Sequence, residues 1–416
     1  MANSKIIVVG GGAAGLMAAI RASESGAETL LLEKMDRPGH KLLLTGNGRC
    51  NISNAEPLTG FLKYYRPDGR FLRQAFAIFF TPQLVEFFER LGIRTVTEAK
   101  GRILPAAAGA KEVVDAMVRL ALRNGVIIRT AAAVKELLVD KTHITGVKCA
   151  AGEFIEADAV IIATGGASYP STGSSGDGYR LAESAGHTII PIRPALVPLE
   201  TAGNTAQKLQ GLSLDDVTVQ VWIDGRKKTQ LRGEVLFTHF GLSGPAVISI
   251  SSAAVDALAG WGKVSVSMDL LPDIDHQKLD KKLVDELSAK GRQKIVTVIS
   301  SFAPRRLAEV FMELADVPAD TVCSQITADH RKKLRMLLKD FRFEITAHRP
   351  IAEAIVTAGG VDTREIDPRT MRSRIIEGLY FAGEVIDIDG DTGGYNLQAA
   401  FSTGFLAGRS AAKESR

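Results

Sequence analysis

Two side chains of this 416-residue chain combine reactive chemistry with a distinctive setting. Cys50 follows Arg49 in the polar, glycine-spaced run Thr45-Gly-Asn-Gly-Arg-Cys-Asn51. A thiol beside a guanidinium gains thiolate character, so Cys50 is a candidate for proton transfer. The alternative is a small buried cysteine in a capped loop. His239, within Phe237-Thr-His-Phe-Gly-Leu-Ser-Gly-Pro245, is the second candidate, and a structural histidine is the other interpretation.

The elements that would position such groups begin at the amino terminus with a nucleotide-binding pattern. An apolar strand, a glycine-rich turn, a helix and a second strand follow one another within about thirty residues, as in a βαβ dinucleotide site. We expect these elements at residues 5–9, 16–25 and 28–32, with Gly10-Gly-Gly-Ala-Ala-Gly15 as the turn.

Each part of this pattern has a physical reason. Gly10 permits the tight turn, Gly12 lets backbone amides approach a pyrophosphate, and Gly15 allows close packing of helix on strand. The helix N-terminus adds partial positive charge. Glu33, at the end of the second strand, can accept hydrogen bonds from a ribose. The candidate contacts are Gly10, Gly12, Ala13, Ala14, Gly15 and Glu33. The pattern predicts dinucleotide binding and leaves both FAD and NAD(P) open.

Two later strands also end in glycine clusters. Residues 158–166 form a buried apolar run that ends in Ala-Thr-Gly-Gly, which in flavoproteins returns the chain to the nucleotide domain; an ordinary glycine turn is the alternative. Residues 379–387 form a similar strand, whose terminal Glu384 could lie near a ribityl chain. The candidate contacts at these strand ends are Thr164, Gly165, Gly383, Glu384 and Asp387.

Two glycine-spaced polar segments complete the set. Residues 393–400 open a predicted helix over 401–412, and its N-terminus offers amides to the N1–C2=O edge of an isoalloxazine. Residues 40–54 follow the second strand closely, so they must lie near the nucleotide, where cationic side chains could meet phosphate or flavin oxygens. The candidate contacts here are Lys41, Gly48, Arg49, Cys50, Asn51, Gly394, Asn396 and Leu397.

These clusters, in this order, resemble one family: the BaiN/YhiN-type flavoproteins, also described as aminoacetone-oxidase-like FAD-binding enzymes. The matching sequences span nearly the whole chain: VVGGGAAGLMAA, KLLLTGNGRCNISN, ATGG with GDGY, LFTHFGLSGPA and GLYFAGEVIDIDGDTGGYNLQAAFSTG. The resemblance implies non-covalent FAD in a glutathione-reductase-like Rossmann domain built from both ends of the chain. It also implies that Lys34 lies at the ADP half, that Val134 contacts adenine through its backbone, and that Asn396 and Leu397 face the flavin ring.

The same resemblance implies the class of reaction. We expect a FAD-dependent oxidoreductase that reduces a conjugated C=C bond by hydride transfer from flavin N5, with Cys50 or His239 supplying the proton and NADPH or NADH as possible electron donor. The alternatives are reduction of a uridine to dihydrouridine in 23S ribosomal RNA, oxidation of a small aminoketone, and a non-enzymatic FAD-containing binding protein. No second G-x-G-x-x-G follows a strand and no C-x-x-C occurs, which disfavours disulfide reductase chemistry.

The way the hydrophobic pattern changes along the sequence predicts a discontinuous α/β fold. The first part of the FAD-binding domain is expected at residues 1–195, with a helical substrate-side segment at about 58–125, and the second part at 350–416. An antiparallel β domain is expected at 196–270, because residues 217–223 and 264–268 alternate and Asp224-Gly225 is a hairpin signal. A helical segment is expected at 271–349.

The charge is uneven although the net charge is only +4. Residues 330–349 carry seven Lys and Arg against two acids, and the hairpin tip adds more cations. Such segments are usually solvated faces, yet on a domain that covers a flavin they could bind RNA. The candidate RNA contacts are Arg226, Lys227, Lys228, Arg331, Lys332, Lys333 and Arg335. The substrate is therefore expected to be a small molecule or ribosomal RNA.

Several classes of protein are disfavoured. No window approaches 18 uninterrupted apolar residues, and the apolar run before Gly10 is too short for a signal peptide, so no membrane partner is expected. The three cysteines are scattered, which predicts neither disulfides nor a metal site. A cytoplasmic location is the expectation, and the sequence leaves the oligomeric state open.

Overall fold

The computed structural model describes residues 4–107, 109–318 and 320–414. The chain divides into two compact units. Unit 1 comprises Met1–Pro194 and Ala354–Arg416, and unit 2 comprises Ala195–Glu353. Each unit has a hydrophobic core of its own.

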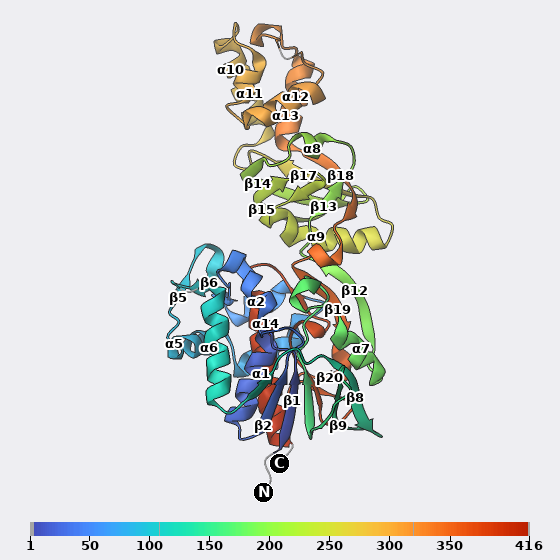
Figure 1. The fold of residues 1–416 in the computed structure, drawn as a ribbon. Coiled ribbons are helices and arrows are strands. Elements are labelled where there is room, and N and C mark those ends of the chain that lie inside the picture. Colours follow the sequence, from blue (N-terminus) through green and yellow to red (C-terminus); the bar gives the residue numbers. More distant parts are fainter. Residues whose placement is uncertain (1–3, 108, 319, 415–416) are drawn as a thin grey trace. The chain divides into compact units, whose positions relative to one another are not determined.

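The central element of unit 1 is a seven-stranded sheet (Figure 1). In spatial order its strands are β20 (Ile366–Asp367), β21 (Arg372–Ser373), β22 (Leu379–Phe381), β11 (Ala159–Ile162), β1 (Lys5–Val9), β2 (Glu28–Leu32) and β7 (Ile127–Arg129). The five strands from β22 to β7 are parallel, and β1, β11 and β22 are almost entirely apolar, as strands covered on both faces require. The predicted α/β Rossmann architecture is confirmed.

Helices and small sheets surround this sheet. The helices of unit 1 are α1 (Ala13–Glu24), α2 (His40–Leu44), α3 (Leu58–Phe61), α4 (Arg73–Ile78), α5 (Thr81–Arg90), α6 (Ala110–Arg123), α7 (Asp177–Ser184) and α14 (Tyr395–Glu414). The small sheets are β10-β9-β8 (Phe154–Glu156, His143–Cys149, Val134–Asp140), β12-β19 (Ile189–Ala195, Val356–Val361), β23-β4 (Asp389–Gly390, Tyr65–Arg66) and β3-β6-β5 (Ser53–Asn54, Arg102–Pro105, Thr95–Thr97). No helix in the described part of the chain is both long and apolar enough to cross a membrane.

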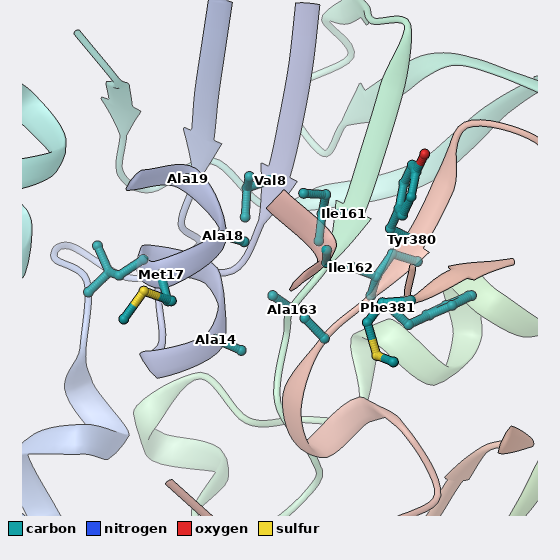
Figure 2. Packing of buried hydrophobic residues seen from close by; sticks show 14 of the residues in the cluster. Val8, Ala14, Met17, Ala18, Ala19, Ile161, Ile162, Ala163, Tyr380 and Phe381 are labelled. Carbon is teal, nitrogen blue, oxygen red and sulfur yellow. The ribbon is translucent and has the colours of Figure 1, made fainter. Parts of the chain in front are cut away.

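The core of unit 1 forms where α1 meets the sheet and α14 (Figure 2). The two helices approach so closely that small residues are obligatory. A Cβ atom on Gly404 would lie 2.2 Å from the carbonyl oxygen of Ala14, and one on Gly408 would lie 2.2 Å from that of Ala18. The buried side chains labelled in this region are Val8, Ala14, Met17, Ala18, Ala19, Ile161, Ile162, Ala163, Tyr380 and Phe381.

Unit 2 is a closed six-stranded barrel with helices (Figure 1). The order around the barrel is β13 (Leu199–Thr201), β16 (Gly241–Ser243), β15 (Arg226–Phe237), β14 (Ser213–Ile223), β17 (Val264–Asp269) and β18 (Phe341–His348). The helices are α8 (Thr205–Lys208), α9 (Pro245–Ala259), α10 (His276–Ala289), α11 (Ile295–Ile299), α12 (Arg305–Leu314) and α13 (Ala328–Lys339). The antiparallel pairing of β14 with β15 forms the hairpin that Asp224-Gly225 predicts.

The segment expected to be helical over 271–349 ends earlier than the sequence analysis predicts. Eight of its last nine residues, Phe341–His348, form β18, which pairs with β17 and β13 and closes the barrel. Phe341, Phe343 and Ile345 are buried, and the intervening side chains are exposed. This two-residue period is the signature of a strand, which the high charge of the segment obscured.

The packing of α1 on α14 leads to a prediction about stability. Replacing Gly408 by Ala forces a methyl group against a backbone carbonyl that cannot move freely, so we expect the free energy of unfolding to fall by about 1–3 kcal/mol. The thermal midpoint of the protein measures this change. The control is Gly291→Ala, where the nearest atom to the new methyl is Ser324 Cβ at 3.8 Å. Equal midpoints for the two variants would contradict the tight packing.

Candidate functional site

The predicted contacts of unit 1 gather at the carboxyl edge of the parallel sheet. β1, β11 and β22 end there at Val9, Ile162 and Phe381, and the glycine-rich turns follow each strand directly. The N-terminus of α1 opens at the same edge, because α1 follows β1 after three glycines. In parallel α/β sheets this edge is where ligands bind.

The glycines of the first turn have two different roles: some are required by the fold, and one leaves space open. Gly10 has φ +101°, and a Cβ atom there would lie 2.6 Å from the carbonyl oxygen of Ala163. A Cβ on Gly15 would lie 1.8 Å from the carbonyl oxygen of Gly10. The fold itself therefore requires these two glycines. A Cβ on Gly12 meets nothing within 4 Å, so at the N-cap of α1 the missing side chain leaves open space in front of the first-turn amides.

Glu33 is held beside this turn by backbone donors. Its Oε2 accepts from Gly11 N at 2.7 Å and its Oε1 accepts from Met35 N at 2.8 Å. A carboxylate has about four acceptor positions, so capacity remains for a ribose hydroxyl. Ala132 N donates to the Glu33 carbonyl at 2.9 Å, which brings the start of β8, where Val134 lies, next to the end of β2.

Lys34 is oriented by α7. Its Nζ lies 2.5 Å from Asp177 Oδ2 and also donates to Ser175 Oγ. The pKa of Asp177 is lowered: burial alone would raise it, but the hydrogen bonds from Lys34, Arg180 and Ser175 outweigh burial. The lysine is thus half-buried and fixed beside the loop that follows β11.

Lys41 and Glu384, predicted as separate cofactor contacts, form an ion pair with each other. Lys41 Nζ lies 2.7 Å from Glu384 Oε2 and 2.7 Å from Ser168 Oγ. Glu384 Oε1 accepts from Thr357 N at 2.8 Å. Two of the three N–H donors of the lysine are therefore used within the protein, and one is left for a ligand.

The amide of Asn396 is engaged within the protein as well. Its Nδ2 donates to the Gly390 carbonyl at 2.7 Å, and its Oδ1 accepts from Gly390 N at 2.8 Å. These bonds fix the loop that leads into α14. Leu397, in the first turn of α14, is half-buried, while Gly394 has φ +101° and would place a Cβ atom 2.2 Å from the Ser53 carbonyl oxygen. Asn51, in the predicted segment before β3, is half-buried.

Of the two interpretations of Cys50, the structure agrees with the small buried cysteine and not with a thiolate. Cys50 is fully buried, with φ +59° and its backbone N donating to the Thr45 carbonyl at 3.0 Å. Burial raises the pKa of its thiol to about 12, and a hydrogen bond with Thr45 offsets this only in part. The guanidinium of Arg49 is more than half exposed and is ion-paired with Glu98, and burial, not this charge, is the main influence on the pKa of the Cys50 thiol. Gly48, beside them, has φ +83° and open space around its Cα.

Two buried polar groups follow the ends of the central strands. Thr164 Oγ1 is buried without a hydrogen-bond partner among the described residues, two residues after the end of β11 and next to Gly165. Asp387 is 8% exposed, and burial raises the pKa of its carboxyl, although the charge of Arg193 opposes this. A buried unpaired hydroxyl is costly unless a partner arrives.

This edge fits the FAD that the family resemblance implies. The open space at Gly12 faces amides suited to a pyrophosphate, and Glu33 offers acceptors suited to a ribose. Thr164 Oγ1 and the remaining N–H of Lys41 provide further polar groups. Gly383, with φ +76° and a virtual Cβ 2.8 Å from Ala14 Cβ, brings the end of β22 against the start of α1.

Unit 2 carries the other predicted residues. His239 is exposed between β15 and β16, with its ring 5.0 Å from that of Phe240. Arg331 and Arg335 on α13 both lie 3.2 Å from Asp280, and Lys333 lies 3.1 Å from Asp316. Their charges are therefore largely offset. The exposed cations are Lys332 on α13 and Arg226, Lys227 and Lys228 at the start of β15. Catalysis by His239 and RNA binding by these cations stay predictions.

Three supporting residues escaped the sequence analysis. Ser168 and Thr357 orient Lys41 and Glu384, and Thr403 Oγ1 accepts from Gly383 N at 2.9 Å. No local motif marks Ser168, which is 127 residues from Lys41, or Thr357, which is 27 residues from Glu384 and 190 from Ala167. Thr403 lies in the Phe-Ser-Thr-Gly run after the predicted helix start, which was the one available signal.

Comparison with known proteins agrees with this geometry. Residues 4–410 match the family described as HI0933-like protein Rossmann domain. The chain is 34% identical to a ribosomal RNA dihydrouridine synthase of Escherichia coli, over 95% of each chain. It is also 34% identical to a 3-dehydro-bile acid delta(4,6)-reductase of Clostridium scindens, over 99% of each.

Among solved structures, the fold is similar to that of the 3-ketosteroid delta1-dehydrogenase of Sterolibacterium denitrificans, with a TM-score of 0.52 and 14% identity over the full length of both chains. A flavocytochrome c3 fumarate reductase has a TM-score of 0.50 and 17% identity, over 99% of this chain and 78% of that one. The chain therefore belongs to the HI0933-like family of Rossmann-fold, FAD-dependent oxidoreductases.

Proposed function

We propose that this enzyme reduces a C=C bond conjugated to a carbonyl group, and that the bond is C5=C6 of a uridine in ribosomal RNA. Two full-length relatives with unlike substrates support the reaction, because a dihydrouridine synthase and a delta(4,6)-reductase both saturate a C=C bond. When bound, FAD would supply a hydride to one carbon of that bond. NADPH or NADH would restore the electrons.

The residues of unit 1 would bind and orient the cofactor. The amides at Gly12 would bind the pyrophosphate, Glu33 the ribose, and Lys41 would donate its free N–H to a cofactor oxygen. The second carbon of the reduced bond needs a proton. Cys50 and His239 remain the candidates, and the raised pKa of Cys50 makes its thiol a weak acid.

The observation that favours RNA is the distribution of unpaired charge on unit 2. The α13 cations are mostly ion-paired, whereas Arg226, Lys227 and Lys228 are exposed and form no ion pair within the described residues. Unpaired cations bind phosphates without first breaking an existing contact. This distribution supports a polyanionic substrate over a small neutral one.

The second candidate is a conjugated small-molecule ketone, which the identity to the bile acid reductase supports. The two substrates are separated by deleting the gene and mapping dihydrouridine in 23S ribosomal RNA. We expect one dihydrouridine to disappear and to return with the wild-type gene. An unchanged map, together with anaerobic turnover of a 3-keto-Δ4 steroid by the purified enzyme, would assign the function to the small molecule.

Gly12→Val tests the cofactor site. The new side chain would occupy the open space at the N-cap of α1, where the fold meets nothing within 4 Å. We therefore expect the variant without FAD to have a thermal midpoint close to that of the wild-type apoprotein. Its affinity for FAD should be at least tenfold weaker, a loss of about 1.4 kcal/mol or more of binding free energy. Titration of apoprotein with FAD, followed by flavin fluorescence, measures the affinity. Gly291→Ala is the control, and unchanged FAD binding by Gly12→Val would exclude a pyrophosphate at this turn.

The raised pKa of Cys50 predicts an inert thiol. With a pKa of about 12 in the folded protein, only about one thiol in ten thousand is ionised at pH 8, so iodoacetamide should modify Cys50 slowly. Deprotonation begins only as the pH approaches 12, so activity should show no alkaline decline from Cys50 below pH 9. Peptide mass spectrometry gives the extent of modification, and urea-denatured protein is the control. Rapid alkylation of the native protein would contradict the buried geometry.

A further inference from the structure

Two loops of unit 2 meet at one end of the barrel. The β14–β15 hairpin turns at Asp224-Gly225, and the connection from α9 to β17 passes through Gly260-Trp-Gly-Lys263. Asp224 N donates to the Lys263 carbonyl at 2.9 Å, and Lys263 N donates to Asp224 Oδ1 at 3.0 Å. These reciprocal bonds fix the hairpin tip and the α9–β17 connection to each other.

Trp261 is the exposed feature of this end. Its side chain is 95% accessible to solvent, the highest value among the large exposed hydrophobic residues that the structure describes. Tryptophan usually stabilises a protein through burial of its large apolar ring, and an indole exposed to water makes no such contribution. Both faces of a ring with this exposure are accessible to a ligand.

The backbone makes the choice of tryptophan more unusual. Trp261 follows the C-cap of α9 with φ +60°, and the next residue, Gly262, donates its N–H to the Ala257 carbonyl at 2.9 Å. This is the position after a helix where glycine or asparagine is preferred, because a Cβ atom is disfavoured there. The fold would therefore favour a different residue, and the indole contributes nothing to the core.

Exposed cations lie near Trp261 in the chain and on the hairpin that is hydrogen-bonded to Lys263. Lys263 lies two residues away, and the facing hairpin adds Arg226, Lys227 and Lys228, all exposed. The nearby carboxylate is Asp224, which already accepts from Lys263 N. Asp256, one turn before the end of α9, adds a second acid. The end of the barrel therefore presents an exposed aromatic ring within a mainly cationic surface.

We propose that Trp261, with Arg226, Lys228 and Lys263, is a stacking platform for an unpaired nucleotide of the RNA substrate. The indole would stack on one splayed base, and the cations would bind the flanking phosphates. Aromatic rings flanked by cations are the usual chemistry for single strands, whereas a duplex hides its base faces. The inference rests on the proposed RNA substrate and adds a single-stranded segment as the element recognised.

The test measures binding of the full-length holoenzyme to a fluorescein-labelled oligouridylate of about ten nucleotides and to an RNA duplex of the same length. We expect Trp261→Ala to weaken single-strand binding roughly 5- to 100-fold by fluorescence anisotropy, with little effect on the duplex. Phe154→Ala is the matched control, since Phe154 is 63% exposed in unit 1 beside Lys148. It should bind RNA as the wild type does.

A second variant separates stacking from folding. Trp261→Gly should keep or raise the thermal midpoint, because glycine suits φ +60°, and should lose the same affinity as Trp261→Ala. The chain has two tryptophans, so the Trp222→Phe variant has Trp261 as its sole tryptophan. Binding of the single-stranded oligouridylate should quench the fluorescence of Trp261. Arg226→Ala and Lys228→Ala should each reduce the slope of log affinity against log salt concentration by about one. Lys281 is exposed but lies outside this surface, so Lys281→Ala is the control and should leave the slope unchanged.

The outcomes separate this inference from the proposed function. If the wild type binds RNA and forms dihydrouridine while Trp261→Ala binds equally well, the platform is wrong and the RNA function stands. If the wild type neither binds RNA nor forms dihydrouridine, both are wrong. A blue shift of Trp261 emission on anionic phospholipid vesicles without quenching by RNA would assign the surface to lipid headgroups and overturn the proposal.

Discussion

The contact on which unit 1 depends is the close approach of α1 to the strand before it and to α14. Backbone carbonyls occupy the positions where Cβ atoms would lie on Gly15, Gly404 and Gly408. Helices that approach at this distance exclude side chains from the interface and fix the axial register of the pair. As a result, the turn at Gly10 and the end of β22 at Gly383 lie at the same edge, although more than 370 residues separate them.

Local patterns predicted the framework of that edge well. The strand, turn and helix at residues 5–24 follow from apolar continuity and glycine spacing, and the hairpin at Asp224-Gly225 follows from its turn residues. These features depend on neighbours in sequence. The strand Phe341–His348 was missed because charged residues occupy its exposed face. The segment was interpreted by its charge, and the two-residue alternation of apolar and polar side chains was overlooked.

The environment of single side chains could not be predicted in the same way. Lys41 and Glu384 were both identified, but their pairing depends on a contact between residues 343 apart in sequence. For Cys50 the sequence left a thiolate and a buried thiol open, because the burial that raises its pKa depends on packing that its neighbour Arg49 does not reveal. A sequence shows how many charged residues a segment contains. Reactivity and binding depend instead on which of those charges are paired with each other in the folded protein.

The insertion of unit 2 between the two parts of unit 1 has a consequence for protein synthesis. All of unit 2 is synthesised before residues 354–416, so most of it can begin to fold while the sheet of unit 1 still lacks β22 and the helix α14. Until then the face of α1 at Ala14 and Ala18 lacks Gly404 and Gly408 of α14 as partners, and the edge that fits the cofactor is incomplete. Unit 1 is therefore completed only when the last residues of the sequence have been added.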